Sequence, residues 1–369
     1  MAYFIRGTGQ AVTPLKHCEE IFKQYMTRMY FTTLSGRRGS GKPIIMDNSL
    51  FKGRGAGDVG RYHFIPQFKG KGIRGQNASV IGNENTIDEY YMDLRIDQIT
   101  QAFAKKGKMT TLRMIWDFRK EAKNQLAEWF RTQTEQDIVD SLSGYNTDGA
   151  TFLDADENLT LDTVKGDHRC LRVDYNSTKF ETVEVNEAGS DTTSLLSAMA
   201  TSDIMNTQIL DVLQDFAKTA DSRYAMRPVR SKNGEEYYIL VLHPKAAISL
   251  RQDARWEKRA IASMTGKGSL EGDPIATGAI GVWEHIIVKE AEFVKTHTND
   301  AGTLTIARNL LLGAEAAVMA WGQTLDYSEE LLDHKRIISD AADEIRGIRK
   351  LCFDGTDLNI AQIPCAIDK

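Results

Sequence analysis

The strongest helical pattern in the chain lies between Met109 and Ser143. Apolar residues recur there at steps of three and four, the spacing of one face of an α-helix. They are Leu112, Ile115, Trp116, Ala122, Leu126, Trp129, Phe130, Ile138 and Leu142. Gly107 and Gly144 bound the stretch. Because a helix rises about 1.5 Å per residue, residues 109–143 would extend about 50 Å, and the pattern predicts a long helical spine.

Shorter patterns predict a second helix and several strands. Residues 202–219 carry apolar side chains at helical spacing, and residues 236–242, EYYILVL, form an apolar run of strand length. Such a run is typical of a strand buried on both faces of its sheet. Further strands are predicted at 281–294, 345–353 and 358–363, with another apolar segment at 303–321. Together these elements predict a mixed α+β protein.

Residues 61–69 alternate in character as a β-strand does. Tyr62, Phe64, Pro66 and Phe68 share one side, and Lys69–Gly72 has the composition of a turn. Pro66 restricts this hairpin to an edge or to isolation, because a central strand would lack its N–H. An isolated hairpin is only marginally stable in water, so a long one with aromatic side chains needs another surface to lie on.

Composition places the chain among ordinary globular proteins. Its 369 residues are 41% hydrophobic and 26% charged, enough to build a sizeable core. It contains no apolar run of about 18 residues, so no membrane span is expected. The first residues lack the apolar segment of a secretory signal, which leads us to expect a cytoplasmic protein. The four cysteines form no CxxC pair and indicate neither a disulfide framework nor a zinc site.

The formal net charge of −5 conceals an asymmetry along the chain. Residues 1–80 contain 13 Lys and Arg against 4 Asp and Glu, a net charge of +9, and the remainder is net −14. A basic region of this kind binds nucleic acid, binds an acidic partner or is simply a solvated face. No nucleic-acid-binding signature accompanies the basic residues. Pairing with the acidic body of another copy would explain both halves of the chain.

The stretch GRRGSGKP at residues 36–43 resembles a phosphate-binding loop. It has two glycines five apart and Lys42, but Pro43 replaces the Ser or Thr that would hold magnesium. A helix N-terminus should also follow, and the next residues, Ile44 and Ile45, favour a strand. A flexible basic arm is therefore the better interpretation, and a nucleotide-binding enzyme is disfavoured.

Other candidate chemical motifs are incomplete. Gly55, Gly57 and Gly60 form GxGxxG with no strand before it or helix after it. Residues 154–165 resemble a calcium loop but have Leu159 in place of glycine and Lys165 in place of the bidentate Glu. The seven histidines lie in separate segments and form no catalytic motif. The sequence thus predicts no catalytic residue, no metal site and no cofactor.

Several stretches carry further information when they are taken in order. They are GDVGRYHF, GKGIRG, YYMDLRIDQITQAF, DFRKEAKNQLAEWF, YYILVLHPKAAISLRQDARW, GDPIATGAIGVWEHIIVKEA, RNLLLGAEAAVMAWG and IRGIRKLCFDGTDLNIAQI. This ordered set resembles the major capsid proteins of tailed double-stranded DNA phages, specifically the branch typified by short-tailed coliphages that carry a virion RNA polymerase. The stretches span about residues 50 to 365, and their order carries more weight than any one of them.

The resemblance implies the Johnson fold of tailed-phage capsids. Its parts would be an N-terminal arm, an extended hairpin loop, a peripheral domain with the spine helix and an axial domain near the capsomer centre. They would lie at residues 1–49, 50–80, 81–224 and 225–324 respectively, with residues 325–369 returning to the peripheral domain. Residues 145–200 are expected to be a surface insertion.

The implied function is a non-enzymatic shell subunit that forms hexamers and pentamers around the phage DNA. Candidate residues for contacts between subunits are Arg54, Arg61, Phe64, Phe68, Lys69, Lys71 and Arg74. The expected partners are other copies of the chain, scaffold, portal and possible decoration proteins, and packaged DNA through non-specific contact. We expect the protein in the virion, assembled in the bacterial cytoplasm. A nucleic-acid-binding protein using the basic region, or a nanocompartment shell of the same fold, remains an alternative.

Overall fold

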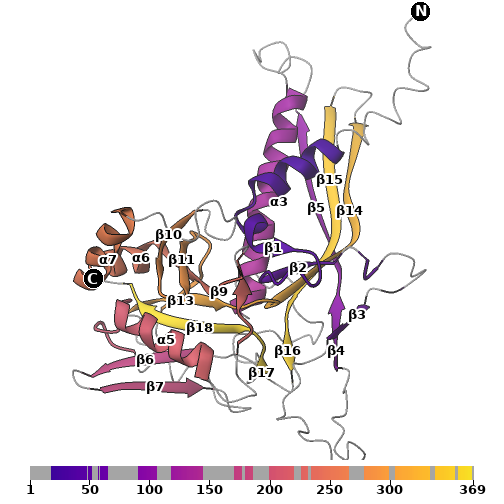
Figure 1. Ribbon diagram of the computed structural model, residues 1–369. Helices are drawn as coiled ribbons and strands as arrows, with labels where there is room; N and C mark the ends of the chain where they lie inside the picture. The colour runs from indigo at the N-terminus through magenta and orange to yellow at the C-terminus, as the bar shows by residue number, and fades with distance from the viewer. Residues whose placement is uncertain are drawn as a thin grey trace, which may run out of the picture.

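The structure is a computed structural model, and it combines helices and strands as the sequence predicts. It describes residues 18–47, 49–51, 57, 59–64, 90–105, 118–143, 170–176, 179–185, 199–219, 226–231, 234–265, 278–298, 304–332, 337–353 and 356–367. Within these ranges two large sheets and a long helix dominate the molecule (Figure 1). The predicted α+β class is confirmed.

The first sheet has five strands in the order β1-β2-β14-β15-β5. Their bounds are Ser35–Gly36, Ile44–Met46, Ala317–Leu332, Ile337–Lys350 and Asp97–Lys105. The long antiparallel pair of β14 and β15 forms its centre. β2 pairs with the start of β14, and β1 pairs with β2. Three helical segments of the described ranges lie beside this sheet (Figure 1). They are a helix at residues 18–28, the 3-10 turn η1 (Tyr30–Leu34) and helix α3 (Phe118–Ser143).

The second sheet has nine strands, seven of them in the order β10-β11-β9-β13-β18-β6-β7. Their bounds are Ala279–Trp283, Ile286–Glu290, Glu236–Leu242, Thr305–Leu312, Ile360–Ala366, Cys170–Asn176 and Lys179–Val185. β8 (Val229–Arg230) pairs with β9, and β12 (Thr296–Thr298) pairs with β13. Helices α5 (Thr207–Thr219), α6 (Pro244–Arg251) and α7 (Ala254–Thr265) pack on one face of this sheet.

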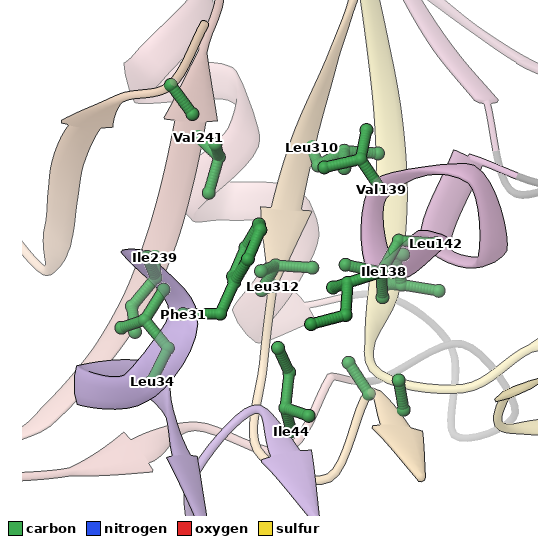
Figure 2. Packing of buried hydrophobic residues seen from close by; sticks show 14 of the residues in the cluster. Phe31, Leu34, Ile44, Ile138, Val139, Leu142, Ile239, Val241, Leu310 and Leu312 are labelled. Atoms are coloured by element: carbon green, nitrogen blue, oxygen red, sulfur yellow. The ribbon is translucent and has the colours of Figure 1, made fainter. Parts of the chain in front are cut away.

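The predicted burial of residues 236–242 is confirmed and has a simple cause. Every residue of β9 after Glu236 is buried. Leu240 packs with α5, α6 and α7, whereas Ile239 and Val241 pack on the opposite face against η1, β2 and α3. Figure 2 shows Ile138, Val139 and Leu142 of α3 pointing toward the apolar cluster that contains Ile239 and Val241. With both faces covered, the strand needs no polar side.

The predicted spine is helical over the part that the structure describes. Helix α3 covers residues 118–143 and ends at the predicted residue, while residues 109–117 lie outside the described residues. Its last turns bury nearly every side chain, polar ones included, because they lie between the two sheets. The amphipathic pattern used to predict this helix therefore describes its first half better than its second.

The second predicted helix begins later than expected, at Thr207 rather than Ser202. The Asn206 side chain accepts a hydrogen bond from the backbone N–H of Ile209 at 2.9 Å, which is the geometry of an N-cap. Asp253 also accepts hydrogen bonds from the backbone and the hydroxyl of Thr207. These polar contacts fix the start of α5, and periodicity alone does not reveal them.

The single strand expected over residues 281–294 is wrong, because the segment forms an antiparallel hairpin of β10 and β11. Glu284 occupies the turn with φ 49°, a left-handed conformation that ends β10. The apolar segment at 303–321 likewise divides into β13 and the start of β14. Near the C-terminus, β15 begins at Ile337, before the predicted residue 345, and is followed by the β16–β17 pair (Cys352–Phe353 and Thr356–Asp357).

Two segments add strands to the nine-stranded sheet from elsewhere in the chain. β6 and β7 come from the expected insertion at 145–200 and pair beside β18. β18 follows the long β15 in sequence but leaves the five-stranded sheet and inserts between β13 and β6, where all its residues are buried. The nine-stranded sheet is therefore built from three separate parts of the sequence.

Candidate assembly surfaces

A two-stranded ribbon projects from the body of the molecule (Figure 1). It pairs β3 (Val59–Phe64) with β4 (Tyr90–Arg95) in an antiparallel register that places Phe64 opposite Tyr90. The predicted strand is thus confirmed over residues 61–64, and it begins two residues earlier than predicted, at Val59. The predicted turn at Lys69–Gly72, and residues 65–89 as a whole, lie outside the described residues.

The inner face of the ribbon attaches it to the five-stranded sheet. Tyr62, Met92 and Leu94 are buried and form a cluster with Ile45 of β2 and Val318 of β14. Phe64, one of the predicted assembly residues, is half-buried and packs against the same cluster. Phe64 therefore contributes to holding the ribbon on its own subunit.

The outer face of the ribbon carries Arg61, another predicted assembly residue. Its Nε lies 2.8 Å from Oδ1 of Asp93, and its Nη2 lies 3.3 Å from Oδ2. The guanidinium also lies 4.0 Å from the centre of the Tyr91 ring, a cation–π contact. The hydrogen bond from Arg61 lowers the pKa of the Asp93 carboxyl, so this pair is ionised at neutral pH. Arg61 is thus already paired within its own subunit.

Two close contacts join the ribbon to β15. Gly347 lies so near β4 that a Cβ atom in its place would collide with the carbonyl oxygen of Arg95. Arg349 donates a hydrogen bond to the carbonyl oxygen of Asp93 at 2.6 Å. The base of the ribbon is therefore fixed to the central strand pair.

The glycine-rich stretch at residues 36–43 is not the flexible arm expected from its composition. The backbone N–H groups of Glu315 and Ala316 donate to the carbonyl oxygens of Lys42 and Pro43 at 2.8 and 2.7 Å, which attaches the segment to β14. Arg38 donates to the carbonyl oxygen of His63 and stacks over Tyr62. The chain then enters β2, so no helix N-terminus is available for a phosphate.

The glycines of this stretch have a structural explanation. Gly39 and Gly41 have φ of 79° and 68°, a region that favours glycine. They form the tight connection between β1 and β2, which run parallel and pair with each other. Turn geometry therefore accounts for Gly41 of the phosphate-loop pattern, whereas Gly36 lies in β1, where a Cβ atom would collide with the Ser40 side chain.

Acidic residues lie opposite each other on the β14–β15 pair. Asp326 of β14 lies directly opposite Asp343 of β15, and Glu329 lies opposite Asp340. Like charges placed opposite each other in this way destabilise a sheet. Burial and the charge of Asp326 raise the pKa of the Asp343 carboxyl. Beside Asp326, a hollow of about 390 Å³ is lined by Glu19, Phe22 and Leu325 among others.

The remaining predicted assembly residues lie outside the described residues; they are Arg54, Phe68, Lys69, Lys71 and Arg74. The calcium-like stretch at 154–165 also lies outside them. Across the described ranges, no group of three or more His, Cys, Asp or Glu could hold a metal ion. The helices of those ranges include none that is long and apolar enough to span a bilayer.

Sequence reasoning missed Tyr91 and Asp93 on the ribbon and the opposed carboxylates of β14 and β15. The alternation in YYMDLR places Tyr91, Asp93 and Arg95 on the side opposite Met92 and Leu94, so the outer face could have been inferred. The carboxylate pairs depend on the register between two strands, for which the sequence contains no local signal.

Comparison with known proteins identifies the family. A model of the family described as phage capsid protein matches residues 15–364. The chain belongs to this family. A curated relative of this phage capsid protein is the major capsid protein of Pseudomonas phage KPP25, 28% identical over 238 residues. That match covers 62% of this chain and 58% of the relative.

Solved structures show that this phage capsid protein has a capsid fold. The capsid chain of Ralstonia phage GP4 matches with a TM-score of 0.72 and 22% identity over 92% of both chains. The capsid of cyanophage Pam1 matches with a TM-score of 0.68 and 18% identity over 93% of both chains. The head of Helicobacter pylori bacteriophage KHP40 matches with a TM-score of 0.62 and 16% identity over 92% of both chains. The expected fold is thereby confirmed.

Proposed function

We propose that the chain is the major capsid protein of a tailed phage, which self-assembles into the icosahedral head that encloses the double-stranded DNA genome. The observation that carries this proposal is the family match over residues 15–364. The likeness to solved capsids over more than nine-tenths of the chain supports it. In this function the protein is a structural component of the virion rather than an enzyme.

The projecting ribbon supports a specific mode of assembly. It is held at its base by buried apolar contacts and leads into residues 65–89, which contain Lys69, Lys71 and Arg74. We propose that these cations contact the opposed carboxylates Asp326 and Asp343 of a neighbouring copy. Each exposed ion pair contributes only about 0.2–1 kcal/mol, so many repeats stabilise a shell while single contacts remain reversible.

We also propose the more specific features that the resemblance to capsid proteins implies. They are the branch of coliphages with a virion RNA polymerase, the division into arm, extended loop, peripheral and axial domains, and assembly in the bacterial cytoplasm. Scaffold, portal and decoration proteins are proposed partners, and DNA is a proposed non-specific contact. Arg54 and Phe68 stay predicted assembly residues.

The first test is electron microscopy and sedimentation of the purified protein at low and high salt. We expect closed shells, or rings of five and six subunits, that dissociate as salt weakens the ionic contacts. A monomer at every salt concentration, with and without a scaffold, would contradict the proposal. DNA retention without self-assembly would instead favour the nucleic-acid-binding alternative suggested by the basic region, and shells that never take up DNA would favour a nanocompartment.

A charge-reversal experiment tests the loop contact. Replacing Lys69, Lys71 and Arg74 together by Glu should abolish shells while the subunit stays folded. Arg61 is left unchanged because reversing it would place a carboxylate beside Asp93. A control with the same change in net charge replaces the exposed cations Lys218, Arg230 and Lys258 by Glu, and it should still assemble.

Complementary reversal identifies the receiving surface. Subunits with Asp326→Lys and Asp343→Lys should assemble with the loop-reversed subunits when the two are mixed, although neither assembles alone. Failure of the mixture, with both variants folded, would remove Asp326 and Asp343 from the proposed contact and leave the shell function in place.

A further inference from the structure

Strand β5 forms an open edge of the five-stranded sheet. In the described ranges it pairs with β15 alone, through nine consecutive residue pairs without a register shift. Every second residue of an edge strand directs its backbone N–H and C=O away from the sheet, where another strand can pair with them. Ile99 and Phe103 pack against the apolar cluster that includes Phe130 of α3 and stay half-buried, so a strand added at this edge would cover what they still expose.

The edge of β5 lacks the usual protection against pairing. Natural sheets protect their edges with short strands, prolines, bulges or charges inside the strand. The other strands that end the two large sheets use such devices: β1 has two residues, β10 has a register shift, and β7 carries three charged residues. β5 has nine residues, DQITQAFAK, with no proline and with charges only at its two ends. A long, regular edge of this kind is suited to the addition of another strand.

The sequence of β5 is complementary to itself in the antiparallel direction. In an antiparallel pair centred on Gln101, Asp97 of each copy lies opposite Lys105 of the other. In the same register Ile99 lies opposite Phe103. Opposite charges and apolar residues that face each other across two strands stabilise their pairing. A shift by two residues in either direction removes both kinds of pair, so the sequence specifies a single register.

We propose that β5 pairs with β5 of a second copy in the antiparallel register centred on Gln101, which joins two five-stranded sheets into one across a two-fold axis. This inference rests on the proposed shell function and deepens it. The contact is isologous, because each copy contributes the same surface. A closed shell needs contacts between its rings of subunits as well as within them, and the two-fold pairing of β5 supplies a contact between rings.

A cysteine at the centre of the register tests the pairing. Gln101→Cys places two Cβ atoms directly opposite each other, about 5 Å apart. Mild oxidation or a short bismaleimide should therefore link most subunits of assembled shells as dimers on a denaturing, non-reducing gel. Gln98→Cys is the matched control on the same strand. Gln98 lies opposite Ala104, so its two copies are about 20 Å apart and should not be linked. The unsubstituted protein, treated in parallel, measures any linkage through the native cysteines.

The outcomes separate this inference from the shell function. Shells that form normally but leave Gln101→Cys unlinked would overturn the pairing of β5 and leave the shell function intact. Equal linkage of Gln98→Cys and Gln101→Cys would overturn the register. If the wild type never associates, both the shell function and this inference fail.

Exchange of the end charges tests the register independently. Asp97→Lys places two cations opposite each other at both ends of the paired strands, and Lys105→Asp does the same with two carboxylates. Each single variant should raise the subunit concentration at which shells close by about tenfold and leave rings of five and six subunits below it. The double variant with Asp97→Lys and Lys105→Asp regains both opposite-charge pairs and should close shells as the wild type does. A double variant that assembles no better than the single variants would contradict the proposed register.

Discussion

Arg346 is a fully buried cation enclosed by acidic groups. Its guanidinium pairs with Asp137 of α3 and with Glu344 of its own strand, and the Tyr25 hydroxyl donates to Glu344 at 3.2 Å. Burial raises the pKa of Glu344, against the opposing effect of the Arg346 charge. The cluster joins the helix at residues 18–28, α3 and β15, so removing Arg346 takes away the charge that compensates its buried carboxylates.

We predict that Arg346→Met lowers the free energy of unfolding by about 3–5 kcal/mol, the usual cost of breaking a buried ion pair from one side. Denaturant unfolding of dissociated subunits measures the change. Arg230→Met is the control, because the Arg230–Glu236 pair is largely exposed and should contribute less than about 1 kcal/mol. Equal changes in the free energy of unfolding of the two variants would show that the buried cluster stabilises the fold no more than an exposed ion pair does.

Lys289 offers a test of how burial affects a charge. It lies on β11 with only 2% of its surface exposed, and its Nζ is 3.4 Å from the Thr33 hydroxyl. Burial, with a smaller contribution from the charge of Lys42, lowers the pKa of Lys289 from 10.5 to about 8. Because the folded state then holds its proton less tightly than the unfolded state, the charged lysine destabilises the fold below about pH 8 and does so less as the pH rises.

We predict that the wild type gains about 3 kcal/mol of stability relative to Lys289→Met between pH 7.5 and 10.5. Denaturant unfolding at several pH values measures both proteins, and their difference removes the titration of the other groups. The exposed Lys258→Met variant should follow the wild type at every pH. Parallel curves for wild type and Lys289→Met would contradict the burial argument.

One of the two close contacts between the ribbon and β15 requires a glycine. Gly347 has no Cβ, and any other residue would collide with the backbone of Arg95 in β4. We predict that Gly347→Ala separates the ribbon from the sheet and costs several kcal/mol, as overpacking against backbone commonly does (about 1–3 kcal/mol or more). Hydrogen exchange should then increase at residues 90–95 and much less in β9. Unchanged exchange at residues 90–95 would show that the sheet can shift to accept the methyl group.

Elements with a strong local pattern could be predicted from the sequence. Gly144 marks the end of α3, the uninterrupted apolar run of residues 236–242 predicts the burial of β9, and side-chain periodicity predicts the alternation of β3. Boundaries set by contacts between distant residues could not be predicted. α5 starts at Thr207 because Asn206 and the remote Asp253 cap it, and the hairpin of β10 and β11 depends on the left-handed backbone of Glu284.

In the candidate site, too, the local features could be predicted from the sequence and the contacts between distant residues could not. The alternating strand and its arginine were visible in the sequence, and the structure gives Arg61 a partner that the sequence did not reveal. Asp93 lies opposite Arg61 because β3 pairs with a strand that begins 26 residues after Phe64, at Tyr90. The flexible arm expected at residues 36–43 was wrong because its partners, Glu315 and Ala316, lie far away in the chain. Strand register and long-range pairing are tertiary properties, which composition does not encode.

At the scale of the whole molecule, one hydrophobic core joins the two sheets. Ile44 and Met319 belong to the five-stranded sheet, Ile239 and Leu310 belong to the nine-stranded sheet, and all four share a cluster with Leu142 of α3. Figure 2 shows several of these side chains pointing toward one another between the elements. At the same junction, Lys295 pairs with Asp140 of α3 at 2.8 Å, and Gln362 donates to the carbonyl oxygen of Ser143 at 2.6 Å. The sheets therefore depend on each other for burial.

We predict that dissociated subunits unfold in a single calorimetric transition, because neither sheet can lose this shared core without exposing the other. Leu142→Ala, in the shared core, should lower the stability by about 2–5 kcal/mol and shift the whole transition. Leu213→Ala, in the core beneath α5 that belongs to the nine-stranded sheet alone, should shift the same single transition. If Leu213→Ala instead produced a second, earlier transition, the nine-stranded sheet would be an independent folding unit and the shared core would not couple the two sheets.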